Sequence, residues 1–477
     1  MAKLQKHLLP GNVPSAFPPH TLSICMIVKN EEESLPGCLD SINGLAEEIV
    51  IVDTGSTDRT VEIAKAHGAK VIASDWRDDF SYSRNISLDH ATSEWVLWLD
   101  ADDRVEEPSK KQILRLKNEI NNPITLFGFK VKNTNDKGMG DIFMQVRMFP
   151  NDKRLRFEWP IHEQIVLSGD RCGYKVLYLN EVEILHSGYH DENLKQKKAL
   201  RNRAIIEKGL KTYGAYPSYV AAYGDTFFMR EEWEKGIEIY KSVLNIPDSR
   251  RKHSDIYEFM FVTIALGYMH LKKTAEALEW VDKGLKDAPD RLELLFLGGD
   301  TSWDAGDFDR AFGYYKRAAN APERFSTTPV DAVALKSKAL MRQGKIHQRR
   351  REFAEAKECF LKINRMNANF FDTPIALGEV YFEEGRILEA LKSFSDSIQR
   401  FPGADPLPYR YLGEICSRVG RGDEAENFYE KGLSFFPEDI SLLEGLKNFY
   451  RDKGETEKYL ELGRRTAEAR ARQGKVT

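Results

Sequence analysis

The chain has 477 residues and a formal net charge of −4, and 30% of its residues are charged and 42% hydrophobic. This length predicts at least two domains, and the even balance of 70 basic and 74 acidic residues argues against a nucleic-acid partner. The five cysteines are scattered and odd in number. They favour a cytoplasmic protein over a disulfide framework or a zinc site.

Residues 1–20 form a predicted N-terminal extension. This segment contains four prolines and lacks the apolar core of a signal peptide. No apolar run in the chain reaches 18 residues, so the sequence predicts no membrane span.

Residues 21–191 predict an α/β domain. The first strands are expected at residues 22–28, 48–53, 70–73 and 95–99. Helices between and after them are expected at residues 32–42, 57–67, 81–90 and 108–120. Strands then dominate, at residues 126–131, 144–149, 161–167 and 175–185. Alternating strands and helices followed by a strand-rich end predict a mostly parallel sheet with antiparallel additions.

After Glu192 the strand patterns vanish, and helical segments repeat. Ala356 and Ala390 are 34 residues apart, and Pro402 and Pro437 are 35 residues apart. This is the period of tetratricopeptide repeats, in which each helix pair has an apolar face that only its neighbours cover.

The repeats divide the remaining chain. We expect a linker helix over residues 192–215, about six repeats over 216–440, and a C-terminal capping helix with a charged tail over 441–477. An insertion with two prolines interrupts the repeats near residues 321–331.

Two apolar strands end abruptly in acidic residues. Asp53 ends one of them, and Asp100, Asp102 and Asp103 follow another. Open α/β sheets bind ligands at the carboxyl ends of their strands. Carboxylates at two such ends predict a site for a nucleotide with a divalent metal.

Four segments carry a family resemblance, at residues 25–32, 51–58, 76–85 and 95–103. The chain resembles family 2 glycosyltransferases, in the branch fused to tetratricopeptide repeats that includes peptide S-glycosyltransferases of the sublancin type and flagellin-modifying enzymes. The resemblance implies an α/β GT-A domain, Rossmann-like and nucleotide-sugar-binding, followed by an all-α solenoid of repeats. It also implies an inverting transferase with a nucleotide-sugar donor, for which UDP-Glc and UDP-GlcNAc are the expected choices.

The resemblance also assigns residues to the donor site. The nucleotide-sugar ligands it implies are Asn30, Glu31, Asp53, Arg84, Asn85, Asp100 and Arg147. It makes Asp102 and His186 metal ligands for Mn²⁺ or Mg²⁺, with support from Asp103. Thr54 stands where many members have a second aspartate, so a role that needs paired carboxylates there is in doubt.

Several of these assignments have structural alternatives. Arg84 could instead pair with Asp78 or Asp79, and Arg147 with Asp152. Asp53 could cap a helix, although the residues that follow it, Ser56 and Thr57, suit that role.

In the fold that the resemblance implies, the catalytic base is expected after the acidic motif, in the segment Glu158–Gln164. An attacking hydroxyl or thiol must lose its proton to a positioned base. Glu163 is the first candidate, and His162 is its partner or its alternative.

The repeats follow all of the donor motifs. They are expected to hold a protein or peptide acceptor, modified on Ser, Thr or Cys, and they also offer a surface for homo-oligomers. A polysaccharide or a lipid-linked glycan is the alternative acceptor. A non-catalytic adaptor with an inactive transferase domain is the alternative to an enzyme.

Overall fold

The computed structural model describes residues 20–120, 122, 124–134, 140–187, 192–252, 254–324 and 326–473. The chain divides into two compact units. The first comprises Met1–Pro289 with Glu323–Asp331, and the second comprises Asp290–Pro322 with Ala332–Thr477. The first unit therefore contains helices that the sequence assigns to the linker and to the first repeats.

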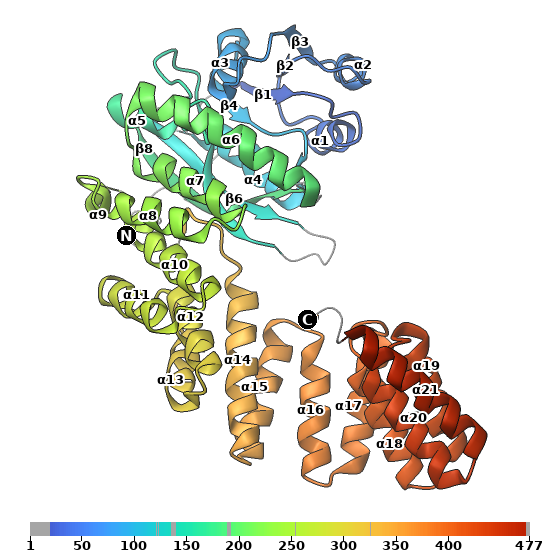
Figure 1. Cartoon of the computed structure of the whole chain (residues 1–477). Helices are drawn as coiled ribbons and strands as arrows, with labels where there is room; N and C mark the ends of the chain where they lie inside the picture. Colours follow the sequence, from blue (N-terminus) through green and yellow to red (C-terminus); the bar gives the residue numbers. More distant parts are fainter. Residues whose placement is uncertain are drawn as a thin grey trace. The chain divides into compact units, whose positions relative to one another are not determined.

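An eight-stranded mixed sheet lies in the first unit (Figure 1), with the strand order β3-β2-β1-β4-β7-β6-β8-β5. Its strands are β1 (Leu22–Val28), β2 (Glu48–Asp53), β3 (Lys70–Ala73), β4 (Trp95–Trp98), β5 (Asp103–Arg104), β6 (Thr125–Asn133), β7 (Ile142–Pro150) and β8 (Lys175–His186). The first four strands are parallel to one another, and β7 is antiparallel to β4 and β6. This arrangement confirms the predicted α/β class.

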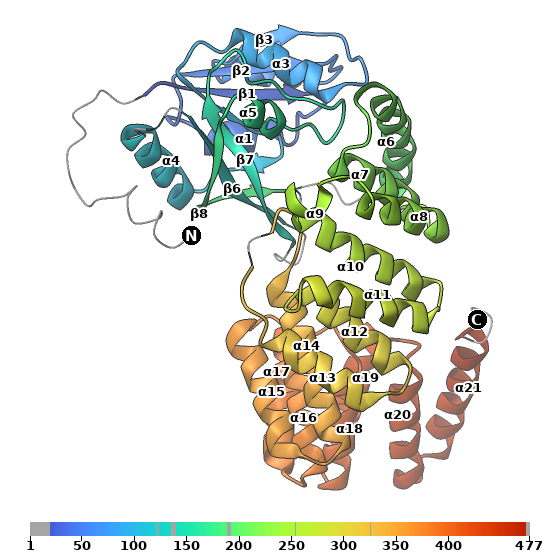
Figure 2. The ribbon, with the colours of Figure 1, turned by 90° about the vertical axis from the view of Figure 1, so that its left-hand side faces the viewer.

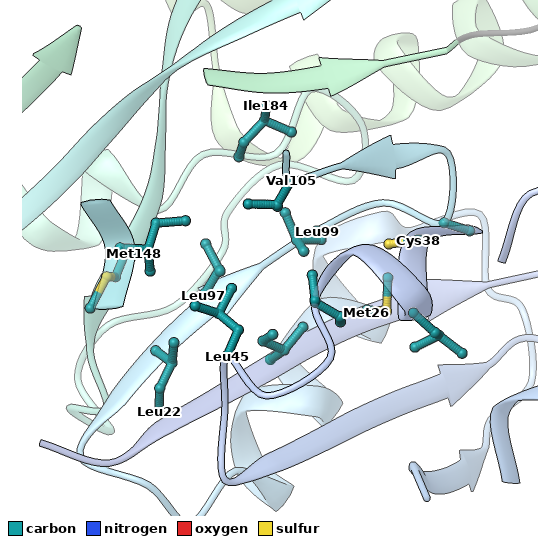
Figure 3. Close-up of a cluster of buried hydrophobic side chains, with 14 of the residues drawn as sticks. Leu22, Met26, Cys38, Leu45, Leu97, Leu99, Val105, Met148 and Ile184 are labelled. Atoms are coloured by element: carbon teal, nitrogen blue, oxygen red, sulfur yellow. The ribbon is translucent and has the colours of Figure 1, made fainter. Parts of the chain in front are cut away.

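The core of this sheet is built from continuous apolar strands. Leu22 and Met26 of β1 pack with Leu97 and Leu99 around β4, and Ile184 of β8 joins the same cluster (Figure 3). All five side chains are buried. Burying a side chain of this size stabilises the fold by about 1.5–3 kcal/mol, so the central strands form a firm support for the loops at their ends.

Five helices accompany the sheet, namely α1 (Leu35–Ser41), α2 (Thr60–Ala66), α3 (Phe80–His90), α4 (Glu107–Glu119) and α5 (Val166–Arg171). The strand predicted at residues 161–167 is wrong. This segment holds one isolated bridge, between Glu158 and Gln164, and then the start of α5. Trp159 and His162 have positive φ angles of 78° and 54°, which no extended strand accommodates.

The rest of the described chain is helical, apart from the insertion. Its helices are α6 (Glu192–Tyr213), α7 (Pro217–Phe228), α8 (Trp233–Leu244), α9 (Ser249–Lys252), α10 (Ser254–His270), α11 (Thr274–Asp287), α12 (Leu292–Asp304), α13 (Phe308–Ala319), α14 (Ala332–Arg349), α15 (Phe353–Met366), α16 (Asp372–Glu383), α17 (Ile387–Arg400), α18 (Leu407–Arg418), α19 (Gly422–Phe435), α20 (Ile440–Lys453) and α21 (Thr456–Gln473). In the second unit, the hairpins α14/α15, α16/α17 and α18/α19 lie side by side (Figures 1 and 2). The region predicted to be a single capping helix contains two helices, α20 and α21.

Glycines and aromatic rings explain the close approach within each hairpin. A Cβ atom added at Gly378 of α16 would lie 2.5 Å from the ring of Phe394 on α17, and one at Gly344 of α14 would lie 2.3 Å from Phe360 on α15. Real side-chain carbons do not approach so closely, so each ring needs the missing side chain opposite it. In these two hairpins, the glycine of the first helix and the phenylalanine of the second helix are thus two halves of one contact.

The insertion between α13 and α14 returns to the sheet of the first unit. The backbone N–H groups of Ile142 and Val330 each donate to the other's carbonyl oxygen at 3.1 Å. The carboxylate of Asp255 on α10 accepts hydrogen bonds from the backbone N–H groups of Thr327 and Thr328. The expectation that no strand-like pairing follows Glu192 is therefore wrong at Val330. No helix among the described residues combines the length and the apolar character needed to cross a membrane.

Candidate active site

The acidic residues meet at one edge of the sheet. Strands β1, β2 and β4 are parallel, with Val28 opposite Asp53 and Cys25 opposite Trp98. The ends of β2 and β4 therefore point the same way. This places Asp53 and the segment that begins at Asp100 at the carboxyl edge, where α/β sheets bind ligands.

Asp103 is the centre of the acidic cluster, and its side chain is fully buried. Its carboxylate accepts hydrogen bonds from Arg147 Nη1 at 2.9 Å and from the backbone N–H of Asp100 at 2.8 Å. It also lies 2.9 Å from Nδ1 of His186. Strand pairing produces this contact, because Asp103 of β5 lies directly opposite His186 of β8. The supporting role expected for Asp103 is thus a structural one.

The carboxylates of Asp100 and Asp102 have pKa values that are shifted in opposite directions. Burial alone would raise the pKa of Asp100, but the cations of Arg84 and Arg147 outweigh it and hold the pKa at about 2. Asp102 has no arginine partner among the described residues. Burial, reinforced by the charges of Asp100 and Asp103, raises the pKa of Asp102 to about 6, although His186 opposes the shift. Asp102 is therefore the carboxylate that most needs a positive neighbour.

His186 stands beside Asp102 and Asp103. Burial alone would lower the pKa of His186, but its hydrogen bond to Asp103 and the charge of Asp102 outweigh burial and raise it. A histidine that donates from Nδ1 to a carboxylate keeps the lone pair of Nε2 for a metal. The resemblance implies that His186 is a metal ligand, and the hydrogen bond with Asp103 is compatible with that prediction.

A divalent cation suits this group of residues. Ligand atoms of Asp100, Asp102, Asp103 and His186 all lie within 4.8 Å of one another. Carboxylate oxygens suit Mg²⁺ and Mn²⁺, and an imidazole nitrogen suits Mn²⁺ better than Mg²⁺. Because Asp103 is already bonded to Arg147, Asp102 and His186 are the better candidates for direct ligands.

Arg84 joins the acidic cluster to the candidate base. Its Nη2 donates to Asp100 at 2.8 Å, and its Nε donates to Glu163 at 2.5 Å. Its guanidinium also lies 4.1 Å from the ring centre of Trp98. The alternative pairing with Asp78 or Asp79 does not occur. The remaining nitrogen, Nη1, is buried without a hydrogen-bond partner among the described residues, so it can serve an oxygen of a bound ligand.

The ion pairs of Arg147 differ from the alternative considered for it, which was pairing with Asp152. It pairs with Asp103 at 2.9 Å and lies 3.8 Å from Asp100. The alternative partner Asp152 is instead held by Arg154. Only 2% of Arg147 is exposed, so its buried ion pair with Asp103 holds the acidic cluster in place.

The loop that carries Glu163 is fastened along one face of α3. The backbone N–H of Phe80 donates to the carbonyl of Pro160 at 2.7 Å. The side chain of Asn85 exchanges two hydrogen bonds of 2.9 Å with the backbone of Phe157. Both polar ends of Asn85 thus bind the backbone of this loop. Asn85 therefore positions the loop, and the nucleotide contact expected of it stays a prediction.

Glu163 and His162 point to different surroundings. Glu163 is bonded through Oε1 to Arg84, and its Oε2 has no hydrogen-bond partner among the described residues. His162 is exposed, and it lies near Asp225 of α7. Among the described contacts, only Glu163 connects this loop to the acidic cluster.

The same loop is anchored to the helices that follow the sheet, through Trp159. This ring is 5% exposed and packs against Tyr213, Tyr216 and Tyr219 of α6 and α7, with ring centres 4.3–5.8 Å apart. The sequence did not predict this contact. The tyrosines at positions 213, 216 and 219 are spaced by three residues, which indicates one helical face, but the spacing does not show that Trp159 packs against them.

Trp159→Ala should loosen the loop and destabilise the first unit by about 3–5 kcal/mol, the usual cost of emptying a buried tryptophan site. Hydrogen–deuterium exchange over residues 157–164 should become faster. Trp233→Ala is the matched control, because Trp233 is half-buried in the same unit and stacks on His270. Unchanged exchange in the loop of the Trp159 variant would show that the aromatic cluster does not hold it.

Hydrogen bonds hold the two loops that follow β1 and β2 at the edge of the sheet. Asp53 accepts hydrogen bonds from the backbone N–H groups of Gly55 and Ser56 at 3.2–3.3 Å. The side chain of Asn30 accepts one from the backbone of Thr57 at 2.8 Å. Helix α2 begins only at Thr60, so the expectation that Ser56 and Thr57 cap it is wrong.

Glu31 and Thr54 complete this edge. Burial and the charge of Asp102 raise the pKa of Glu31, which places Glu31 close to the acidic cluster. Thr54 is buried, and its hydroxyl donates to the carbonyl of Val28 at 3.1 Å. This hydrogen bond joins the ends of β1 and β2.

Comparison with known proteins relates part of this chain to glycosyltransferases. Residues 23–179 match the model of the glycosyl transferase family 2. A glycosyltransferase of Bacillus subtilis, the SPbeta prophage-derived SunS, is 25% identical over 259 residues, which are 53% of this chain and 59% of that protein.

Further relatives match shorter segments. A TPR repeat-containing protein of Synechococcus elongatus is 34% identical over 195 residues, which are 40% of this chain and 48% of that protein. The chain thus spans about half the length of the curated relatives it matches. Among solved structures, the C-terminal part of a TPR repeat-containing protein of Cytophaga hutchinsonii aligns over 54% of this chain and 99% of its own, with 12% identity and a TM-score of 0.41.

Proposed function

Because the chain carries a family 2 glycosyltransferase domain fused to tetratricopeptide repeats, we propose that it transfers a sugar from a nucleotide sugar to a protein or peptide. The proposed donor is UDP-Glc or UDP-GlcNAc, and the acceptor is a Ser, Thr or Cys side chain. The transfer inverts the anomeric carbon in one displacement. The name of the relative SunS supports sugar transfer, and the repeats support a protein acceptor.

One observation carries the proposal. Arg84 bonds Asp100 of the acidic cluster and Glu163 of the following loop at the same time. The acidic edge, which is proposed to hold a cation and diphosphate, lies next to a carboxylate whose second oxygen, Oε2, has no hydrogen-bond partner among the described residues. Arg84 thus contacts both the cluster proposed to bind the leaving group and the carboxylate proposed to remove the proton.

The residues divide the proposed reaction between them. The acceptor oxygen or sulfur attacks the anomeric carbon, its proton passes to Oε2 of Glu163, and the bond from carbon to the diphosphate oxygen breaks. Nη1 of Arg84 donates a hydrogen bond to a diphosphate oxygen in the proposed complex. Asp53, Asn30 and Glu31 line the edge proposed for the nucleoside.

Asp102 and His186 are the proposed holders of a divalent cation. When bound, Mn²⁺ or Mg²⁺ neutralises the charge of the departing diphosphate.

Incubation with a panel of sugar nucleotides and Mn²⁺ tests the activity. We expect UDP release from one UDP-sugar, and a matching mass increase on candidate acceptor proteins from the host in intact-mass spectra. The mass identifies the sugar and the modified protein together. If a folded preparation releases no nucleoside diphosphate with any sugar nucleotide, the chain is an adaptor and not a transferase.

A further inference from the structure

A groove in the second unit has no part in the site described above. Two adjoining cavities of about 670 and 600 Å³ share Arg342 and Lys345 of α14. They are lined by successive first helices of the hairpins, α12, α14 and α16. The groove therefore crosses several repeats, as an extended ligand would require.

The α14 wall of this groove is a stripe of cations. Lys338, Arg342, Lys345 and Arg349 follow one another at steps of four, three and four residues, so they share one face of the helix. Arg351 follows at the end of the helix and lines the larger cavity. A stripe of this kind stands out in a chain whose net charge is −4.

The charges are distributed unevenly along the groove. Arg342, Lys345, Arg349 and Arg351 line the larger cavity, and Glu383 is the carboxylate among the lining residues. The smaller cavity has carboxylates on its walls as well, at Asp300, Asp372, Glu379 and Asp405. The cationic end of the groove is therefore the larger cavity.

Two of the four cations of the larger cavity have no ion pair among the described residues. Arg342 lies 3.5 Å from Asp300, and Lys345 pairs with Glu379. Arg349 and Arg351 have no ion pair among the described residues. The guanidinium of Arg349 stacks 4.2 Å from the ring centre of Phe308, which fixes its plane and leaves N–H donors for a carboxylate. Trp303 adds an apolar wall to the same cavity.

We propose that this groove docks an acidic, extended segment of the acceptor protein, with carboxylates of the segment against Arg349 and Arg351. Carboxylates of a peptide match the two guanidiniums, and its apolar side chains match Trp303 and Phe296 of α12. The identity of the segment as part of the acceptor rests on the proposed function, whereas its docking does not. The groove thus selects acceptors that carry acidic residues away from the modified side chain.

The test uses the full chain and two fluorescein-labelled decapeptides, one of alternating glutamate and alanine and one of alternating lysine and alanine. Fluorescence anisotropy should show binding of the glutamate peptide, weaker binding at higher salt, and no binding of the lysine peptide. The double variant Arg349→Glu/Arg351→Glu should weaken binding about tenfold or more, as reversal of contacting charges does.

The matched control is Lys392→Glu/Lys431→Glu. It makes the same change in net charge at exposed lysines of α17 and α19, outside both cavities, and should bind the glutamate peptide as the parent does. The proposal is overturned if the parent does not bind this peptide, if both variants lose binding equally, or if a single-stranded oligonucleotide of equal charge competes as well. UDP release measured in parallel separates this outcome from failure of the proposed function, because loss of docking leaves donor hydrolysis intact.

Discussion

Glu163→Gln should lower the turnover of sugar transfer by a factor of about 10² or more, the usual contribution of a general base, and leave donor binding nearly unchanged. The amide oxygen can still accept the hydrogen bond from Nε of Arg84, which Oε1 accepts in the structure at 2.5 Å. The loop therefore keeps its place, and only the proton acceptor is lost. Steady-state turnover and calorimetric titration with UDP measure the two effects separately.

His162→Ala is the decisive comparison for this assignment. The ring of His162 is exposed and lies near Asp225, and no described hydrogen bond or ion pair joins it to the acidic cluster, so its removal should change turnover by less than about threefold. If His162→Ala loses activity and Glu163→Gln keeps it, the histidine is the base. If Glu163→Gln also loses affinity for UDP, Glu163 holds the donor site together and is not the base.

The sequence predicted those parts of the fold that local pattern controls. The apolar runs ending at Val28 and Asp53 gave the bounds of β1 and β2 as the structure has them. The acidic motif after β4 lies where the resemblance implied, because a parallel sheet brings the carboxyl ends of its strands to one edge. A continuous apolar run needs little information from the rest of the chain to become a central strand.

Long-range contacts account for what the sequence could not supply. Ile161 and Ile165 suggested a strand, yet they are buried because the loop between Trp159 and His162 turns back on itself with two positive φ angles. No spacing rule pairs Trp159 with tyrosines more than fifty residues later. Such contacts depend on which surfaces the finished fold brings together, and a single sequence does not list those surfaces.

The candidate site shows the same division. The resemblance implied that Arg84 and Arg147 bind the nucleotide sugar, but the sequence left their partners within the protein open. The structure gives Arg84 to Asp100 and Glu163, while Arg147 lies under Asp103. The choice follows from strand register, since Asp103 lies opposite His186 and the antiparallel pairing of β4 with β7 brings Arg147 to the same edge.

Asp102→Asn should abolish sugar transfer while the fold survives and becomes more stable. The carboxylate is the one in the cluster that lacks an arginine partner among the described residues, and burial with the charges of Asp100 and Asp103 raises its pKa to about 6. An unfolded aspartate has a pKa near 3.9. The ionised form is therefore disfavoured in the folded state, by roughly 2–3 kcal/mol.

The sign of the pH dependence follows from this difference in pKa. Above about pH 6 the folded, cation-free parent carries the full cost of the ionised carboxylate, and below about pH 4 Asp102 is protonated in both states and the cost disappears. In a chelator, Asp102→Asn should thus melt at a higher temperature than the parent at pH 8, and at nearly the same temperature at pH 4. Asp40→Asn, at an exposed ion pair with His67, should not melt above the parent at either pH. Transfer activity within threefold of the parent at limiting Mn²⁺ would remove Asp102 from the metal site, and equal melting at pH 8 would mean that its charge is already compensated. We expect a carboxylate that binds a cation to destabilise the fold in a chelator and to be indispensable to the reaction.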